Sequence, residues 1–69
     1  MDLIGIGKQL EKRRKELNLR QEDVAEMSGI TARTIYNIEE GKSNPSYKTL
    51  SKLCEILGLG ISINIKQLN

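Results

Sequence analysis

The chain lacks the residues with which small domains bind metals or form disulfides. It contains one cysteine, Cys54, and no histidine among its 69 residues. A single cysteine cannot close an intramolecular disulfide, and without histidine the usual Cys/His metal cluster cannot form. We therefore expect no metal and no cofactor. The fold must be stabilised by packing, within one modest core or against a partner subunit.

Long apolar runs and the features of an enzyme are absent as well. No run approaches the roughly 20 apolar residues of a membrane-spanning helix. Residues 1–7 have neither the basic start nor the small-residue cleavage site of a signal peptide. The carboxylates are scattered, and neither a glycine-rich phosphate loop nor the setting of a nucleophile is present. We expect a cytoplasmic protein that is not an enzyme and takes no small-molecule substrate.

The net charge of +2 is too small to indicate nucleic-acid binding, but the charges are unevenly distributed. Basic side chains dominate residues 1–20, whereas residues 21–30 carry only the acidic Glu22, Asp23 and Glu26. The basic run at residues 12–15 has two interpretations at this point, a solvated helix face or a surface for nucleic acid.

Apolar residues at helical spacing predict an amphipathic helix over about residues 3–17. Asn18 ends it, because asparagine tolerates the left-handed conformation that commonly follows a helix. A short second helix is expected over residues 21–28, with its apolar residues toward the core. These are Val24, Ala25 and Met27.

Gly29 interrupts the second helix, and Thr31 is a suitable N-cap for a third helix. Ile35 and Ile38 lie on the inner face of this third helix, and Gly41 closes it. Two short helices separated by a glycine-containing turn predict a helix-turn-helix unit.

Residues 41–46 form the clearest loop of the chain, and Ser46 caps a fourth helix. The apolar stripe of that helix consists of Leu50, Leu53, Cys54 and Leu57. Cys54 has no activating neighbour in the sequence, so we expect a buried core residue rather than a redox switch.

The period of the apolar pattern changes from 3.6 to 2 in residues 61–66, which predicts a β-strand with Ile61, Ile63 and Ile65 on one side. No second strand is predicted elsewhere, so its partner would be the same strand of another copy, in a homodimer. The alternative is a loosely docked tail. We expect residues 1–59 to form the helix-turn-helix domain and residues 60–69 to form the dimerisation strand and tail.

Several segments resemble the Cro/CI (XRE) family of DNA-binding domains. They are QEDVA at 21–25, SGIT at 28–31, IYNIEEG at 35–41 and NPS at 44–46. The resemblance covers about residues 6–59. It implies an all-α, lambda-repressor-like four-helix domain that binds double-stranded DNA with residues 31–40 in the major groove.

The resemblance assigns base reading to the outward residues of the third helix, and their chemistry suits this role. An alanine methyl can meet a thymine methyl, arginine can bind guanine O6 and N7, and asparagine can pair with adenine N6 and N7. The expected base-reading residues are Thr31, Ala32, Arg33 and Asn37. The alternative is that these side chains are merely solvated.

The resemblance also implies phosphate contacts around the reading helix. Gln21 would bind a phosphate at a helix N-terminus, where the helix dipole and free amides favour an anion. Tyr36 has two interpretations, a phosphate contact through its hydroxyl or packing over a neighbouring helix. The expected phosphate-binding residues are Arg20, Gln21, Thr34, Tyr36, Lys42, Ser43, Asn44 and Lys48.

The resemblance also implies one ion pair with a structural role and one departure at a helix cap. Arg14 of the first helix is expected to form a partly buried ion pair with Glu39 of the third. Arg20 stands where the family usually has a capping Ser or Thr, so we expect the cap to be lost and a phosphate contact to be gained.

The chain departs from most of the family after Gly58, where the predicted strand replaces a fifth helix. This ending, with residues 1–5, resembles the small HipB-type antitoxins, in which a C-terminal strand pairs across the dimer. The resemblance implies a bacterial homodimeric repressor of a palindromic operator that also binds a HipA-like kinase toxin. The alternatives are a phage, plasmid or restriction-modification controller without a toxin, and a protein-interaction module that no longer binds DNA.

Overall fold

The computed structural model describes residues 2–63, and this part of the chain is helical, with no strand. Its helices are α1 (Leu3–Glu16), α2 (Gln21–Ser28), α3 (Ala32–Glu39) and α4 (Tyr47–Leu57). The predicted all-α fold is confirmed for these residues, and each helix lies where the sequence pattern indicated. No helix in the described range is long and apolar enough to cross a membrane.

Short polar side chains begin three of the helices. Asp2 accepts a hydrogen bond from the backbone N–H of Gly5 at 2.8 Å. Thr31 caps α3 by accepting from Thr34 N–H at 3.2 Å, and Ser46 caps α4 in the same way. These bonds satisfy amides that have no partner within the helix. The predicted caps at Thr31 and Ser46 are confirmed.

The predicted end of α1 is confirmed as well. Asn18 adopts a left-handed conformation with φ of 58°, outside the range that most residues adopt. The Asn18 N–H donates to the Lys15 carbonyl at 2.9 Å, and the Leu19 N–H donates to the Arg14 carbonyl at 3.1 Å. The chain therefore turns sharply from α1 toward α2.

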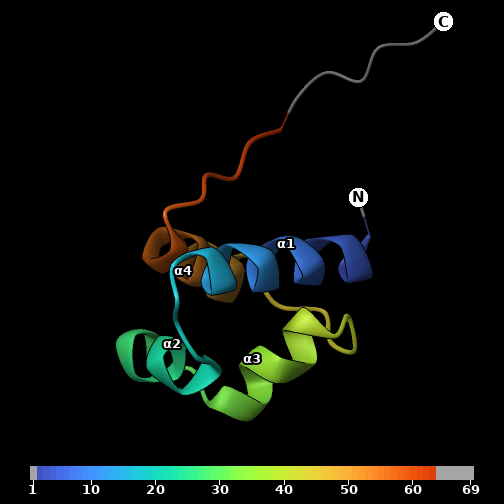
Figure 1. The fold of residues 1–69 in the computed structure, drawn as a ribbon. Coiled ribbons are helices and arrows are strands. Elements are labelled where there is room, and N and C mark those ends of the chain that lie inside the picture. The colour runs from blue at the N-terminus through green and yellow to red at the C-terminus, as the bar shows by residue number, and fades with distance from the viewer. Residues whose placement is uncertain (1, 64–69) are drawn as a thin grey trace, which may run out of the picture.

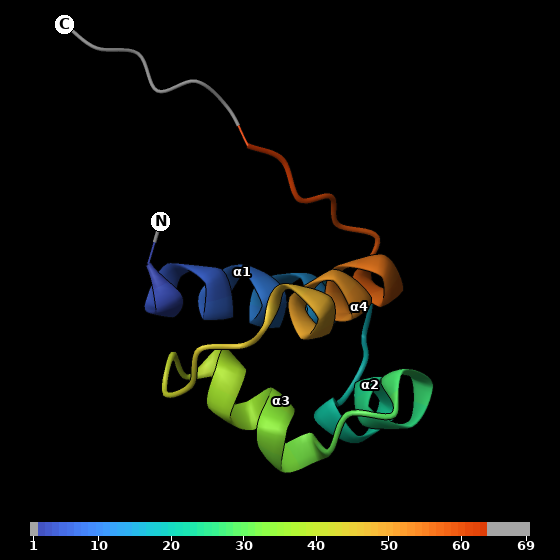
Figure 2. The ribbon, with the colours of Figure 1, turned by 180° about the vertical axis from the view of Figure 1, so that it is seen from behind.

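The helices form two layers, α1 with α4 and α2 with α3 (Figure 1). Seen from behind, the same arrangement holds, and residues 59–63 leave α4 on the side away from α2 and α3 (Figure 2). The helix-turn-helix unit thus lies on the opposite side of the molecule from residues 59–63.

The hydrophobic core lies between these layers and receives side chains from every helix. Its buried members are Leu10, Val24, Ile35, Ile38, Leu53, Cys54 and Leu57. Leu50, the remaining member of the predicted α4 stripe, is half-buried against the same cluster. Burial raises the pKa of the Cys54 thiol, which is the direction expected of a core residue without an activating neighbour.

Met27 does not face the core, so that prediction is wrong. Its side chain is 52% exposed, whereas the neighbouring Ser28 is buried. Ser28 and Ala25 lie on one side of Val24 around the helix axis and Met27 lies on the other, so the face centred on Val24 and Ser28 turns Met27 toward solvent. The Ser28 hydroxyl accepts a hydrogen bond from Ile30 N–H at 3.0 Å, which allows a polar side chain at this buried position.

The predicted C-terminal strand is not seen in the part of it that the structure describes. Residues 61–63 are not part of a strand, and Ile61 and Ile63 are exposed. Ile65 and the rest of the predicted strand lie outside the described residues. A strand that pairs with another copy would lack its partner in a single chain, so dimerisation and the boundary at residue 60 stay predictions.

Candidate nucleic-acid interface

The turn between α2 and α3 fixes the geometry of the helix-turn-helix unit. Gly29 has a φ of 76°, which glycine adopts without strain, and its N–H closes α2 by donating to the Ala25 carbonyl at 2.8 Å. Residues 29–31 are thus held between the last turn of α2 and the Thr31 cap of α3. The direction of α3 follows from these local bonds.

Helix α3 has an inner face and an outer face. Ile35, Ile38 and Glu39 are buried against the rest of the molecule. The predicted base-reading residues lie elsewhere on the helix: Thr31 and Arg33 are exposed, and Ala32 and Asn37 are half-buried. Thr34 is also exposed, and the Thr31 hydroxyl donates to its hydroxyl at 2.9 Å. The structure therefore brings the predicted base-reading set together along one accessible helix.

A buried ion pair fixes α3 to α1. The Arg14 Nε donates to Glu39 Oε2 at 2.7 Å, and a second guanidinium nitrogen donates to Oε1 at 2.9 Å. Arg14 also donates to the Leu19 carbonyl at 2.8 Å, and hydrogen bonding to Glu39 raises the pKa of Arg14. The pair is more deeply buried than the sequence analysis expected, with the Glu39 side chain only 3% exposed. Both charges are paired and hydrogen-bonded, as burial requires.

Gln21 joins this network, a contact that the sequence analysis missed. Its side-chain amide donates to Glu39 Oε1 at 3.0 Å, and the residue is half-buried at the start of α2. One N–H of the amide is therefore used inside the protein, while a side-chain amide carries two. A phosphate contact by Gln21 would use the second N–H.

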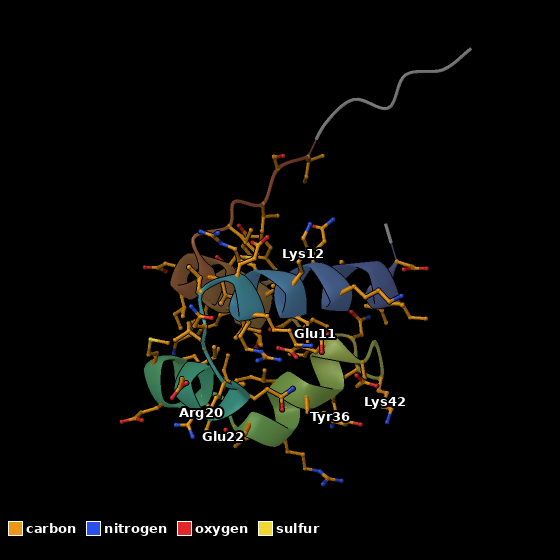
Figure 3. The ribbon with its side chains drawn as sticks, viewed as in Figure 1. Glu11, Lys12, Arg20, Glu22, Tyr36 and Lys42 are labelled. Carbon is orange, nitrogen blue, oxygen red and sulfur yellow. The ribbon has the colours of Figure 1, made fainter. Side chains whose placement is uncertain are left out.

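Arg20 is tied to Asp23 in the first turn of α2. The Asp23 carboxylate accepts from the Arg20 backbone N–H at 2.7 Å and from its guanidinium at 3.1 Å. Arg20 provides no side-chain cap, as expected, but Asp23 supplies the return bond of a capping box. Hydrogen bonds from Arg20 lower the pKa of Asp23. Arg20 lies on the α2 side of the unit (Figure 3), and its side chain is 75% exposed.

The chain leaves α3 through a tight turn at Gly41. The Lys42 N–H donates to the Asn37 carbonyl at 2.9 Å, and the Gly41 N–H donates to the Ile38 carbonyl at 3.1 Å. With a Gly41 φ of 72°, this is the Schellman arrangement of a helix end. The Lys42 ammonium lies 5.2 Å from the centre of the Tyr36 ring. Figure 3 shows both side chains at this end of α3.

The other predicted phosphate-binding residues follow this turn. Asn44 and Lys48 are exposed. Ser43 is half-buried, and its hydroxyl oxygen is buried with no hydrogen-bond partner among the described residues. In this conformation the Ser43 hydroxyl is not open to a phosphate.

The basic run at residues 12–15 is used mainly to hold α1. Arg14 forms the buried ion pair, and Arg13 donates to the Leu57 carbonyl of α4 at 2.8 Å. Lys15 lies 3.6 Å from Glu11 on an exposed face. Figure 3 shows Lys12 on the side of α1 away from α3. Between the two interpretations of this run, the structure favours a solvated and structural face. In residues 2–63, no group of acidic, cysteine or histidine side chains is arranged to hold a metal ion.

The fold and the exposed polar face of α3 define a helix-turn-helix domain, and comparison with known proteins identifies its family. The pattern of the helix-turn-helix family HTH_3 matches residues 10–64. The chain belongs to this family, which is of the Cro/CI (XRE) type.

Curated relatives carry the names of transcriptional regulators. The chain is 41% identical over 56 residues to the HTH-type transcriptional regulator PuuR of Escherichia coli, covering 81% of this chain and 30% of PuuR. It is 39% identical over 49 residues to an uncharacterised HTH-type transcriptional regulator of Methanothermobacter thermautotrophicus, covering 71% of each chain. It is 31% identical over 58 residues to the ImmF control region 10 kDa protein of Bacillus phage phi105, covering 84% of this chain and 64% of that protein. The chain thus spans less than a third of PuuR.

Proposed function

We propose that this chain is a sequence-specific DNA-binding transcriptional regulator that inserts α3 into the major groove. The observation that carries the proposal is the division of α3 into two faces. Ile35, Ile38 and Glu39 anchor its inner face, which leaves Arg33 exposed on a helix whose direction is fixed at both ends. A rigidly held helix with exposed hydrogen-bonding side chains is what the major groove requires of a reading element.

We assign the proposed DNA contacts from the hydrogen-bonding groups of each side chain. Thr31, Ala32, Arg33 and Asn37 read base edges, with Arg33 binding guanine in bidentate fashion. Phosphate contacts flank the reading helix on both sides and orient it without carrying sequence information. The proposed phosphate-binding set is Arg20, Gln21, Thr34, Lys42, Asn44 and Lys48, together with Ser43 if its hydroxyl turns outward; Tyr36 lies beside Lys42 in this set.

The regulator acts as a homodimer on a palindromic operator, with half-sites one helical turn, or about 34 Å, apart. Support comes from residues 61–63, which lie beyond α4 on the side away from α2 and α3 (Figures 1 and 2). Ile61 and Ile63 are exposed there, and burying them against a second copy would remove apolar surface from water. Pairing of this segment between two copies that stand side by side does not cover α3, so both reading helices can face the same duplex.

Within this class we propose repression by a HipB-like antitoxin that binds a HipA-like kinase toxin and represses the operon of both proteins. The proposal rests on the sequence after α4, where isoleucines alternate with polar residues from Ile61 to Lys66.

A phage, plasmid or restriction-modification controller without a toxin is the second candidate, and the likeness to the phage phi105 control-region protein favours it. The third candidate, a protein-interaction module without DNA binding, has no such support. The exposed Arg33 argues against it.

Selection from a library of randomised duplexes tests the proposed function. We expect recovery of an inverted repeat with a guanine at a fixed position in each half-site, and loss of preference at that position for Arg33→Ala. Failure of the wild-type chain to enrich any sequence would contradict DNA reading. Enrichment of a single, unrepeated site would contradict the symmetric dimer.

Purification of the chain from its native host separates the antitoxin from the controller. Co-purification of a kinase-like protein in a fixed ratio supports the antitoxin. A chain that elutes with operator DNA alone supports the controller.

A further inference from the structure

The end of α3 holds a pair of side chains that the sequence analysis treated separately. The Lys42 ammonium lies over the Tyr36 ring at 5.2 Å from its centre. A cation within about 6 Å of an aromatic face is attracted by the negative charge of the ring face. The two residues are six positions apart, so the contact depends on the turn that follows α3.

That turn fixes the backbone of Lys42. Its N–H is bonded to the Asn37 carbonyl, and Gly41 adopts the left-handed conformation that brings the chain back over the last turn of α3. Gly41 also packs closely against Ile4 of α1, because a Cβ at this position would lie 2.8 Å from the Ile4 side chain. The Lys42 backbone is therefore held by its bond to α3, and the preceding Gly41 is packed against α1.

The side chain of Lys42, by contrast, is exposed and held by nothing but the Tyr36 ring among the contacts of the described residues. A lysine stem has high rotamer entropy, which a phosphate contact must overcome. The ring covers one side of the ammonium and leaves its other N–H donors free, since an ammonium carries three. Tyr36 is itself 42% exposed, so the pair lies at the surface beside the reading helix.

We propose that Tyr36 promotes DNA binding through Lys42, as a positioning residue: its ring holds the ammonium in place, and Lys42 makes the phosphate contact. The proposal rests on the proposed function, because it requires that α3 approach DNA. It differs from the expectation that the Tyr36 hydroxyl binds phosphate itself, since the hydroxyl has no part in the contact with Lys42.

A double-mutant cycle tests the proposal, with a mixed-sequence duplex of about 30 base pairs as the probe. The variants of the full chain are Tyr36→Phe, Tyr36→Leu, Lys42→Ala and the combination of Tyr36→Leu with Lys42→Ala. Tyr36→Phe keeps the ring and should bind as the wild type does. Tyr36→Leu should weaken binding about two- to five-fold.

The cycle and the salt dependence report the role of Lys42. Lys42→Ala should reduce the slope of log K against log salt by about one, the effect of one lost phosphate contact. Adding Tyr36→Leu to Lys42→Ala should cause no further loss of affinity for the duplex. Lys48→Ala is the matched control, because it removes another exposed lysine. Adding Tyr36→Leu to Lys48→Ala should still lower the affinity for the duplex about two- to five-fold.

A spectroscopic readout separates positioning from folding. The Lys42 side-chain protons should show a ring-current shift in the wild type and in Tyr36→Phe, and lose it in Tyr36→Leu. Thermal unfolding of each variant checks that the fold is kept.

Three results would overturn the proposal while leaving the proposed function intact. They are an equal loss for Tyr36→Phe and Tyr36→Leu, an unchanged cost of Tyr36→Leu when Lys42 is absent, and an unchanged salt slope for Lys42→Ala. A wild-type chain that binds no duplex would overturn the proposed function and this proposal together.

Discussion

Arg14 and Glu39 meet edge to edge inside the protein, with two parallel hydrogen bonds of 2.7 and 2.9 Å between the guanidinium and the carboxylate. This geometry is the strongest form of a protein ion pair, because both donors and both acceptors are used at once. It connects α1 to the last turn of the reading helix. Through Glu39 it also reaches Gln21 at the start of α2.

Removing one partner of this pair should destabilise the fold strongly. Arg14→Ala leaves the Glu39 carboxylate buried without its cation, and we expect a loss of about 3–5 kcal/mol in the free energy of unfolding. Urea unfolding followed by circular dichroism measures it. Arg20→Ala, which removes an exposed and locally paired arginine, is the control and should lower the free energy of unfolding far less. If both variants lost the same free energy of unfolding, burial of the Arg14–Glu39 pair would not be the cause of the loss.

A second prediction concerns the contact of α1 with α3 at Gly7. A Cβ at Gly7 would clash with the carbonyl oxygen of Ile38 and lie 2.8 Å from the carbonyl carbon of Glu39. Gly to Ala inside a helix normally stabilises by roughly 0.5–1 kcal/mol. Because backbone atoms cannot move aside as a flexible side chain can, Gly7→Ala should instead destabilise by about 1–3 kcal/mol.

Gly60→Ala is the matched control for this prediction, since a Cβ there would meet nothing within 4 Å. Thermal unfolding should show a lowered melting temperature for Gly7→Ala and almost none of that change for Gly60→Ala. A stabilised Gly7→Ala variant would mean that α1 and α3 lie further apart than the structure has them.

Most of the fold could be predicted from the sequence because its signals are local. The caps at Thr31 and Ser46 and the turn at Asn18 depend on residues within five positions of each other, and such patterns are visible in a sequence. The burial of Ser28 in place of Met27 was missed, because positions three and four after Val24 both lie near its face and the apolar residue was expected to take the buried position.

The contacts of the candidate site were harder to predict because they join residues that only the fold brings together. The bond from Gln21 to Glu39 crosses 18 positions. The contact of Lys42 with Tyr36 depends on the exact turn at Gly41. The buried hydroxyl of Ser43 likewise reflects the path of the loop, which residue types alone do not determine. For Tyr36, the ring contact with Lys42 adds a third interpretation to the two that the sequence left open.

Base reading and phosphate binding should respond differently to mutation. Arg33→Ala should weaken binding to the selected operator by about 1–3 kcal/mol and leave non-specific duplex binding nearly unchanged. Lys48→Ala should weaken binding to both duplexes alike, because phosphates carry no sequence information. Fluorescence anisotropy with the two duplexes at matched salt measures both affinities. An unchanged ratio of specific to non-specific affinity for Arg33→Ala would remove Arg33 from the reading face.

The stability of α2 should depend on pH through Asp23. Its pKa is lowered from the ordinary 3.8 by the hydrogen bonds from Arg20. A carboxyl with a lowered folded-state pKa contributes stability that is fully present above about pH 3.8 and is lost as the pH falls through the lower, folded-state value. The free energy of unfolding should therefore decline over that acidic range.

Asp23→Asn should remove this part of the decline, so the difference between wild type and variant should shrink below about pH 3.8. Arg20→Ala should also reduce it, because the guanidinium bond is gone while the backbone bond remains. Urea unfolding at a series of acidic pH values gives the comparison. A constant difference across the series would mean that Asp23 has the same pKa in the folded and unfolded chain.

The last prediction concerns residues 61–69 and the pairing of two copies. Ile61 and Ile63 are exposed beyond α4, while the core of residues 10–57 is complete without them. Deleting residues 61–69 should therefore leave the helical fold intact and lower both dimer affinity and operator affinity, because two linked half-site contacts bind far more tightly than one. Sedimentation equilibrium measures the dimer affinity, and fluorescence anisotropy with operator and half-operator duplexes measures the operator affinity. The full chain should prefer the operator over the half-operator, and the truncated chain should lose that preference. A truncated chain that still sediments as a dimer would place the interface on the helices instead.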